Sequence, residues 1–180
     1  MRADKYTCYA VLAVLSITSG CKDDPVSARN KLEAMEGDSK FEEVSSLPEG
    51  VAVKHTPEQI KAIIGGDSGM KYTWRYSTTV NTIEKQLTIV EFGCFTLIDN
   101  EWIFSNYTGK PFTSSNFEEW YSCPESKLVP GSSYSDPLLM NSSDELRSGK
   151  MLWYFIGEDA KGNKYQGTAQ AQYVAELETE

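Results

Sequence analysis

Few side chains in this 180-residue chain have the types and spacing that catalysis requires. The chain has one histidine, His55, and Ser68 follows it within the glycine-rich stretch GGDSGM at 65–70. A serine becomes a nucleophile when a histidine takes its proton and a buried carboxylate orients that histidine. His55 lies only thirteen residues before Ser68, across one short predicted element. We therefore expect 65–70 to be a flexible turn.

The GGDSGM stretch nevertheless resembles the nucleophile loop of trypsin-like serine proteases, in which Ser68 would be the nucleophile. That family places its histidine far upstream of the serine, on a second β-barrel. This chain has neither the length for two barrels nor a histidine in that position. We expect that the protein is not an enzyme.

Metal and acid–base chemistry find no better support in the sequence. One histidine supplies too few nitrogen ligands for zinc or copper, and DAKGNKY at 159–165 lacks the alternating oxygen ligands of a calcium loop. Its Asp, Gly and Asn are the residues that a hairpin turn uses. Glu118 and Glu119 are neighbours on a predicted helical turn, so they point in different directions. We expect no metal and no cofactor.

The N-terminal residues have the order of a secretory signal. Arg2 and Lys5 precede a short apolar stretch at 8–17, and small residues lead up to Cys21. About twenty apolar residues are needed to cross a bilayer, so a cleaved signal at 1–20 fits better than a permanent span. The pattern resembles bacterial lipoproteins, which implies that the mature chain begins at an acylated Cys21. Two or three acyl chains anchor a protein stably.

The three residues after the anchor, Lys22, Asp23 and Asp24, resemble the export signal of Bacteroidota lipoproteins. The resemblance implies a protein that is lipid-anchored in the outer membrane and displayed on the cell surface. The alternative is the periplasmic face, with these residues as the beginning of a charged linker. The net charge of −9 excludes the clustered positive charge that nucleic acid requires.

Cys94 and Cys123 are the cysteines that remain once Cys8 and Cys21 are assigned to the signal and the anchor. An even pair in an exported protein predicts a disulfide. Such a bond would stabilise the fold by about 3–4 kcal/mol on the chain-entropy model. The alternative is a pair of buried thiols.

Composition divides the mature chain into two parts. Residues 21–50 are rich in charged and small polar residues, which predicts an acidic flexible tether. Residues 51–180 contain the strand-like periodicity and are expected to form a single domain.

One short helix is expected at the start of this domain, over 57–64. Thr56 and Gln59 fit a capping box, Pro57 suits the first helical position, and Gly65 would end the helix.

After residue 70 the apolar pattern alternates, which predicts strands. Strands are expected at 71–80, at 86–104 with a hairpin turn at Asp99–Asn100, and in a third hairpin over 151–174. The apolar run at 151–156 has no polar face, so it is expected to be a central strand. The inward-facing set of the second strand is expected to be Val90, Phe92, Cys94 and Ile98.

These features predict a mainly β protein. LVPGSSY at 128–134 and IGEDAKGNKYQG at 156–167 resemble the late strands of fibronectin-III and other immunoglobulin-like domains. The resemblance implies an immunoglobulin-like antiparallel β-sandwich, preceded by the short helix. A lipocalin-like barrel is the alternative.

Aromatic side chains are the remaining candidates for ligand contacts. Trp102, Tyr107, Trp120 and Tyr121 lie near predicted turns, where sugar-binding modules expose stacking rings. Phe117, Trp120 and Tyr121 also have the spacing of a helical turn packed onto a core, which is the favoured interpretation. The expected function is a non-catalytic surface lipoprotein that binds a glycan or an envelope protein. The alternative is a carrier of small apolar ligands or a cryptic hydrolase.

Overall fold

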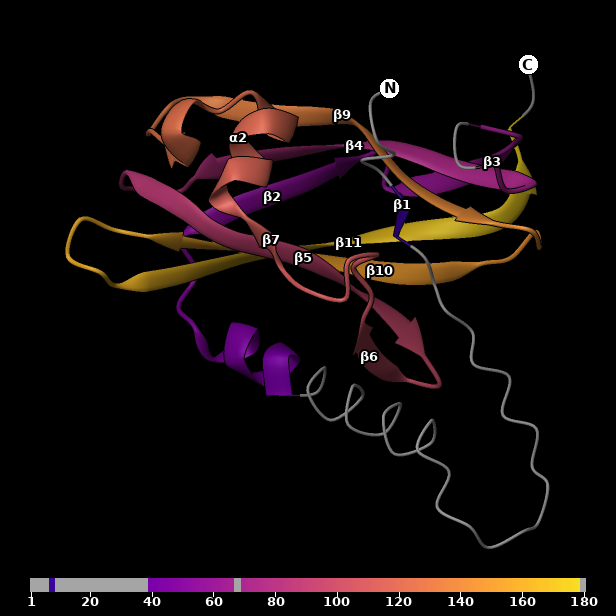
Figure 1. The fold of residues 1–180 in the computed structure, drawn as a ribbon, viewed down its shortest axis with the longest axis horizontal. Helices are drawn as coiled ribbons and strands as arrows, with labels where there is room; N and C mark the ends of the chain where they lie inside the picture. The colour runs from indigo at the N-terminus through magenta and orange to yellow at the C-terminus, as the bar shows by residue number, and fades with distance from the viewer. Residues whose placement is uncertain (1–6, 9–38, 67–68, 179–180) are drawn as a thin grey trace, which may run out of the picture.

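The computed structural model describes residues 7–8, 39–66 and 69–178 of the chain. These residues form a curled, mixed β-sheet with two helices packed against it, which confirms the mainly β class (Figure 1). The strands are β1 (Thr7–Cys8), β2 (Val51–Thr56), β3 (Gln59–Ile64), β4 (Tyr72–Thr82), β5 (Leu87–Ile98), β6 (Glu101–Phe104), β7 (Phe112–Thr113), β8 (Lys127–Leu128), β9 (Ser133–Ser143), β10 (Gly149–Glu158) and β11 (Lys164–Leu177).

The order along the sheet is β1-β9-β4-β3-β11-β10-β5-β6. In addition, β2 pairs with β4, while β7 and β8 pair with β5. Neighbouring strands are antiparallel except for two parallel pairs, β11 with β3 and β1 with β9. The sheet curls so that β9, β4 and β2 lie over β11, β10 and β5 (Figure 1). This arrangement is consistent with a β-sandwich or a half-barrel.

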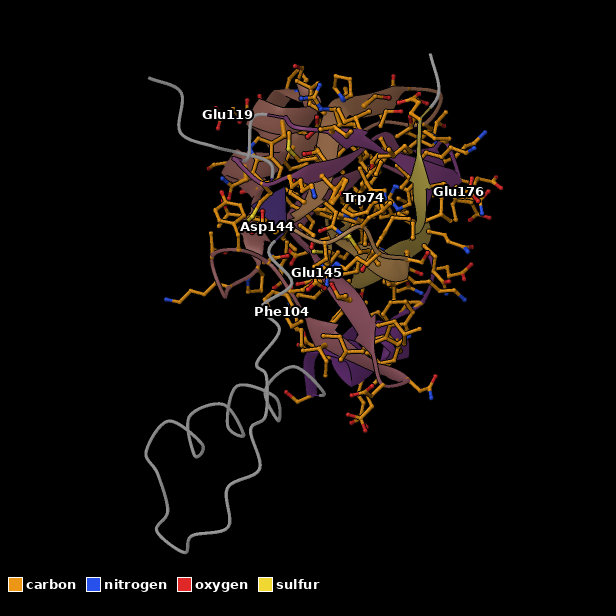
Figure 2. All side chains as sticks on the ribbon, turned by 90° about the vertical axis from the view of Figure 1, so that its right-hand side faces the viewer. Trp74, Phe104, Glu119, Asp144, Glu145 and Glu176 are labelled. Atoms are coloured by element: carbon orange, nitrogen blue, oxygen red, sulfur yellow. The ribbon has the colours of Figure 1, made fainter. Side chains whose placement is uncertain are left out.

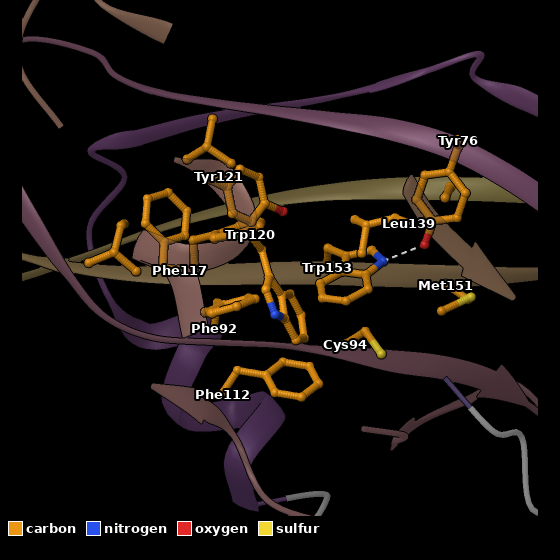
Figure 3. Packing of buried hydrophobic residues seen from close by; sticks show 14 of the residues in the cluster. Tyr76, Phe92, Cys94, Phe112, Phe117, Trp120, Tyr121, Leu139, Met151 and Trp153 are labelled. Atoms are coloured by element: carbon orange, nitrogen blue, oxygen red, sulfur yellow. Dashed lines mark hydrogen bonds between the residues drawn. The ribbon is translucent and has the colours of Figure 1, made fainter. Parts of the chain in front are cut away.

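The main core lies between these two layers and is largely aromatic. Phe92 on β5 is its centre, with ring contacts to Phe112, Trp120 and Phe155 among others. Trp153 on β10 donates a hydrogen bond from Nε1 to the hydroxyl of Tyr76 on β4, 2.6 Å away (Figure 3). This bond joins the two layers through buried side chains.

Residues 57–64 are not the helix that the capping pattern predicted. They contain β3, which lies between β4 and β11, and the peptide bond between Thr56 and Pro57 is cis. Ile60 and Ala62 face the core on alternate positions, whereas a helix would place Ile60, Ile63 and Ile64 on one face. Hydrogen bonds to strands on both sides therefore outweigh a local capping signal.

The inward register of β5 changes at a β-bulge. Phe92 and Cys94 are in the main core as expected, but the pairing with β10 shifts between Ile156 and Gly157. The extra residue turns Ile89 inward and places Val90 against the opposite face of the sheet. The expected turn at Asp99–Asn100 is confirmed, because both residues have positive φ angles and join β5 to β6.

The tether predicted for 21–50 does not extend to residue 50. The chain is helical at residues 39–46, and this N-terminal helix packs on the outer face of β5 and β10 (Figure 1). Val44 is 1% exposed and lies in a second apolar cluster with Phe95 and Tyr154. The part of the predicted tether at 21–38 lies outside the described residues.

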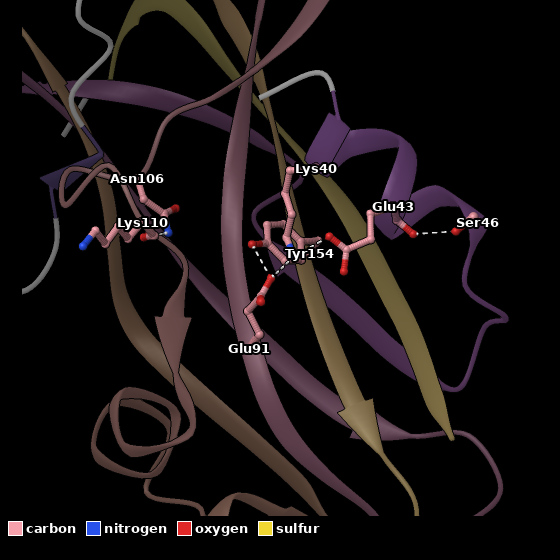
Figure 4. Close-up of polar contacts among 7 residues, drawn as sticks. All are labelled: Lys40, Glu43, Ser46, Glu91, Asn106, Lys110 and Tyr154. Carbon is pink, nitrogen blue, oxygen red and sulfur yellow. Dashed lines mark hydrogen bonds and ion pairs between the residues drawn. The ribbon is translucent and has the colours of Figure 1, made fainter. Parts of the chain in front are cut away.

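An ion-pair cluster fixes the N-terminal helix to the sheet. Lys40 Nζ lies 2.6 Å from Glu91 Oε1 on β5 and 3.0 Å from Glu43 Oε2 (Figure 4). The Tyr154 hydroxyl on β10 donates to the same Glu91 oxygen at 2.9 Å. The two central strands are therefore covered on both faces, as the apolar run at 151–156 predicted.

The second helix, α2 (Ser114–Tyr121), is followed by a 3-10 turn at Pro124–Ser126. Phe117, Trp120 and Tyr121 on α2 are buried in the main core. The backbone N–H of Thr113 donates to Asn116 Oδ1 at 3.0 Å, and Thr113 is the N-terminal cap of α2. Charged side chains such as Glu119, Glu145 and Glu176 project from the surface, while Trp74 lies inside (Figure 2).

Candidate functional site

His55 lies on β2 with its ring buried, 3% exposed. Its Nε2 atom is 3.1 Å from the carbonyl oxygen of Ala169, which can only accept, so Nε2 carries the proton. Nδ1 therefore accepts from the Thr78 hydroxyl, 2.8 Å away. Burial lowers the pKa of His55 to about 4, so the ring is neutral near pH 7. Both ring nitrogens are already engaged with the fold, and Ser68 lies outside the described residues.

The position of His55 explains its burial. Backbone hydrogen bonds join β11 to residues 48–50 at Gln166 and to residue 58 at Gln172. Between these points the backbones of β2 and β11 separate, and His55 supplies the donor for Ala169. A Cβ atom at Gly167 would overlap the carbonyl oxygen of Val51, so the strands approach closely just before they separate. The His55 side chain thus links β2 to β11 by a hydrogen bond where their backbones are not paired.

A polar pocket of about 320 Å³ lies over this gap. Its lining residues are Val53, Lys54, His55, Glu58, Lys150, Ala169, Gln170 and Gln172. His55 forms part of the floor and is occupied by its two hydrogen bonds. The other polar groups that line the pocket are exposed side chains on the outer face of the sheet.

The expected disulfide between Cys94 and Cys123 is not formed; both residues are buried, reduced cysteines. Cys94 Sγ lies 3.5 Å from the Ser105 hydroxyl, whereas Cys123 Sγ donates to the carbonyl oxygen of Lys127 at 3.4 Å. Each thiol therefore has its own local partner. Burial raises the pKa of Cys123 to about 11, which keeps it neutral near pH 7.

The four candidate stacking aromatics do not form a platform. Trp120 and Tyr121 are core residues of α2, as the favoured interpretation predicted. Trp102 stacks on Phe41 of the N-terminal helix with ring centroids 6.4 Å apart. Tyr107 is 40% exposed and packs against Phe112. The exposed ring of Tyr107 has no second platform ring beside it among these four.

A second pocket, of about 440 Å³, lies where two hairpin tips meet. One tip is the turn from β4 to β5, and the other is the turn from β10 to β11. Its lining residues are Lys85, Gln86, Asp159, Ala160, Lys161, Asn163 and Tyr165. We call this the hairpin-tip pocket.

Hydrogen bonds organise the polar groups of the hairpin-tip pocket. Lys85 Nζ donates to the Tyr165 hydroxyl at 2.8 Å and lies 4.2 Å from the centre of its ring. The same hydroxyl donates to Asp159 Oδ2 at 3.3 Å, and Asn163 Nδ2 donates to that oxygen at 3.0 Å. A chain of contacts thus runs from the lysine through the tyrosine to the carboxylate.

The Asp159 carboxylate is also held by the backbone of its own turn. Its Oδ1 atom accepts from the N–H groups of Lys161 and Asn163 at 2.9 and 3.0 Å. The side chain of Asn163, with these backbone donors, lowers the pKa of Asp159 to about 2. The carboxylate is therefore ionised across the physiological range and fixed in direction.

The sequence predicted the β10–β11 turn but not this pocket. Lys85 and Gln86 come from a different hairpin, and only the curl of the sheet brings the two tips together. Asp159, Gly162 and Asn163 were the residues of this region that stood out in the sequence. They are residues that a hairpin turn uses, so they predicted the turn and gave no sign of a pocket.

The lipid-anchor residue Cys21 and the export residues Lys22, Asp23 and Asp24 lie outside the described residues. Within 39–66 and 69–178, no three His, Cys, Asp or Glu side chains are placed to hold a metal ion. No helix in the part of the chain that the structure describes is both long enough and apolar enough to span a bilayer. Comparison of the sequence with protein-family models and with curated proteins gives no match.

Proposed function

We propose that this protein is a cell-surface lipoprotein, anchored in the outer membrane through Cys21, whose β domain binds a glycan in the hairpin-tip pocket. The domain is a binding module and performs no catalysis. The observation that carries the binding proposal is the hydrogen-bonded chain of Lys85, Tyr165 and Asp159.

The order of the N-terminal residues supports the anchor. Arg2 and Lys5 precede a short apolar stretch at 8–17, and small residues lead from it to Cys21. Lys22, Asp23 and Asp24 support export to the cell surface.

The chemistry of the hairpin-tip pocket supports a carbohydrate. A sugar presents hydroxyl groups that both donate and accept hydrogen bonds, and the pocket offers the ammonium groups of Lys85 and Lys161 and the amides of Gln86 and Asn163. The Asp159 carboxylate is engaged by its own turn and by Tyr165, so it fixes the geometry of the pocket before a ligand binds.

The alternatives have weaker support in the geometry. A carrier of apolar ligands needs an apolar cavity, whereas the two pockets described above are lined mainly by polar side chains. A hydrolase built on His55 would need a ring nitrogen that is available to a substrate or a nucleophile. Thr78 and Ala169 occupy both nitrogens.

Glycan-array binding by the soluble mature chain, residues 22–180, tests the proposal. A double variant, Lys85→Ala with Gln86→Ala, is expected to reduce affinity for the bound glycan by about tenfold or more, because hydrogen bonds to charged groups contribute roughly 1.5–3 kcal/mol. Both residues are exposed, so the variant should keep its fold.

The matched control is Lys54→Ala with Gln170→Ala, an exposed lysine and glutamine at the pocket beside His55. The control should bind as the wild type does. Equal binding by the wild type and the Lys85/Gln86 variant would show that the glycan does not bind in the hairpin-tip pocket. An array on which the wild-type chain binds nothing would contradict the proposed ligand class.

A further inference from the structure

Asp159 supplies the carboxylate among the lining residues of the hairpin-tip pocket, and the fold already uses its acceptor sites. Its Oδ1 atom accepts from the backbone N–H groups of Lys161 and Asn163. Its Oδ2 atom accepts from Asn163 Nδ2 and from the Tyr165 hydroxyl. A carboxylate offers about four lone-pair sites for hydrogen bonds. Asp159 therefore has little capacity left for the hydroxyl groups of a ligand.

The two lysines of the pocket keep donors for a ligand. Lys85 Nζ donates to the Tyr165 hydroxyl at 2.8 Å and lies 4.2 Å from the centre of that ring, so the ammonium group is held at the pocket. An ammonium group has three N–H donors, and this contact uses one of them. Lys161 is exposed, and its Nζ atom has no hydrogen-bond or ion-pair partner among the residues that the structure describes.

The charged groups that the pocket can offer to a ligand are therefore positive. Its lining contains two lysines and one aspartate, whereas the whole chain has a net charge of −9. Glu84 and Glu158 are neighbours of pocket residues in the sequence but do not line the pocket. The hydrogen bond to Tyr165 raises the pKa of Lys85, so this side chain stays an ammonium ion across the physiological range. The acidic net charge of the protein opposes nonspecific binding of anions, so an anion that binds here is recognised locally.

The size of the pocket suits an anionic group that belongs to a sugar. Its volume of about 440 Å³ lies within the range of small-molecule sites, roughly 300–1,000 Å³. Lys85 comes from the turn between β4 and β5 and Lys161 from the turn between β10 and β11, and both turns lie at the same end of the molecule (Figure 1). An anionic group at the two ammonium groups leaves the amides of Gln86 and Asn163 for the hydroxyl groups of the sugar.

We propose that the hairpin-tip pocket selects acidic sugars, and that Lys85 and Lys161 bind the negatively charged group, which is a carboxylate or a sulfate. This inference rests on the proposed function and names the chemical class of its glycan. Hydrogen bonds between an ammonium group and an anionic oxygen are stronger than those to a neutral hydroxyl. A neutral sugar of the same shape therefore binds more weakly.

Matched pairs of probes separate the charge from the rest of the sugar. Trigalacturonic acid and its methyl ester share their hydroxyl groups and differ in the charge of the carboxyl groups, and dextran sulfate and dextran make the same comparison for sulfate. In isothermal titration calorimetry, the mature chain, residues 22–180, should bind at least one charged probe about tenfold or more tightly than its neutral counterpart. The pair that shows this difference identifies the anionic group as a carboxylate or a sulfate.

Variants of Lys161 show whether the charge is recognised in this pocket. Lys161→Gln removes the charge from an exposed side chain, so it should keep the fold, reduce affinity for the charged probe by about tenfold and leave affinity for the neutral probe unchanged. Lys161→Arg keeps the charge and should bind as the wild type does. The matched control is Lys150→Gln, at the exposed lysine of the pocket beside His55, which should also bind as the wild type does.

The proposal is overturned if charged and neutral probes bind equally, if no probe binds, or if Lys161→Gln and Lys150→Gln reduce affinity alike. Equal binding of charged and neutral probes that the Lys85/Gln86 double variant weakens would keep the glycan site and reject its preference for acidic sugars. A glycan array on which the wild-type chain binds nothing would contradict the proposed function itself.

Discussion

Replacing Val44 with aspartate is expected to destabilise the domain by at least about 3 kcal/mol, because it places an unpaired charge in an apolar cluster. Val44 is 1% exposed and packs with Phe95, Tyr154 and Ile156 on the outer face of β5 and β10. The loss would be a large share of the 5–15 kcal/mol that typically holds a domain folded. Urea unfolding of the mature chain measures it.

Ser45→Asp is the control, because Ser45 is the next residue of the same helix and is exposed. It should change the free energy of unfolding by less than about 0.5 kcal/mol. If Val44→Asp and Ser45→Asp were equally stable, the N-terminal helix would not be part of the folded domain. A fragment that begins at Val51 should likewise be less stable than the mature chain, since it exposes the outer face of the two central strands.

The second large effect is a dependence of stability on pH that His55 causes. Its pKa is lowered to about 4 in the folded protein, against 6.5 for the unperturbed side chain. Between these values the unfolded chain binds the extra proton, so the free energy of unfolding rises with pH. The stability from this group is complete above pH 6.5 and is lost as the pH falls toward 4.

The expected loss between pH 7.5 and pH 4.5 is roughly 2–3 kcal/mol more in the wild type than in a His55→Gln variant. The variant removes the titrating ring and leaves the charged neighbours in place, namely Lys54, Glu58 and Lys150 beside the gap and Asp136 on β9. Carboxylates elsewhere affect both chains alike, so the difference isolates His55. Parallel pH profiles for the two chains would show that the ring is not buried as a neutral donor.

The sequence was a good guide where the signal is local to one strand or turn. Alternation predicted β4 and β11, the pair Asp99–Asn100 predicted its turn, and the unbroken apolar run predicted that β10 is central. The strand predictions depend on the pattern of apolar residues along a single segment, and the turn prediction depends on two neighbouring residues. The run at 151–156 also required a cover on its second face, which the N-terminal helix provides.

The sequence misled where distant partners decide the outcome. Capping residues favoured a helix at 57–64, but β4 and β11 offer backbone partners on both sides of this segment. The composition of 39–50 favoured a tether, yet Phe41, Val44 and Leu47, together with the ion pair of Lys40 with Glu91, hold this segment on the outer face of the sheet. The cysteine count favoured a disulfide, but the fold gives each thiol a separate partner.

Acylation and surface exposure of the protein in a Bacteroidota host test the central claim most directly. The measurement combines labelling with a radioactive fatty acid and digestion by protease added to intact cells. The proposed function predicts that the wild type is labelled, fractionates with the outer membrane and is digested, and that Cys21→Ala carries no label and is released or retained as the precursor. Asp23→Ala with Asp24→Ala should remain labelled but become resistant to the protease. A mature-sized Cys21→Ala protein that stays tightly bound to the membrane, or an unlabelled wild type, would contradict it.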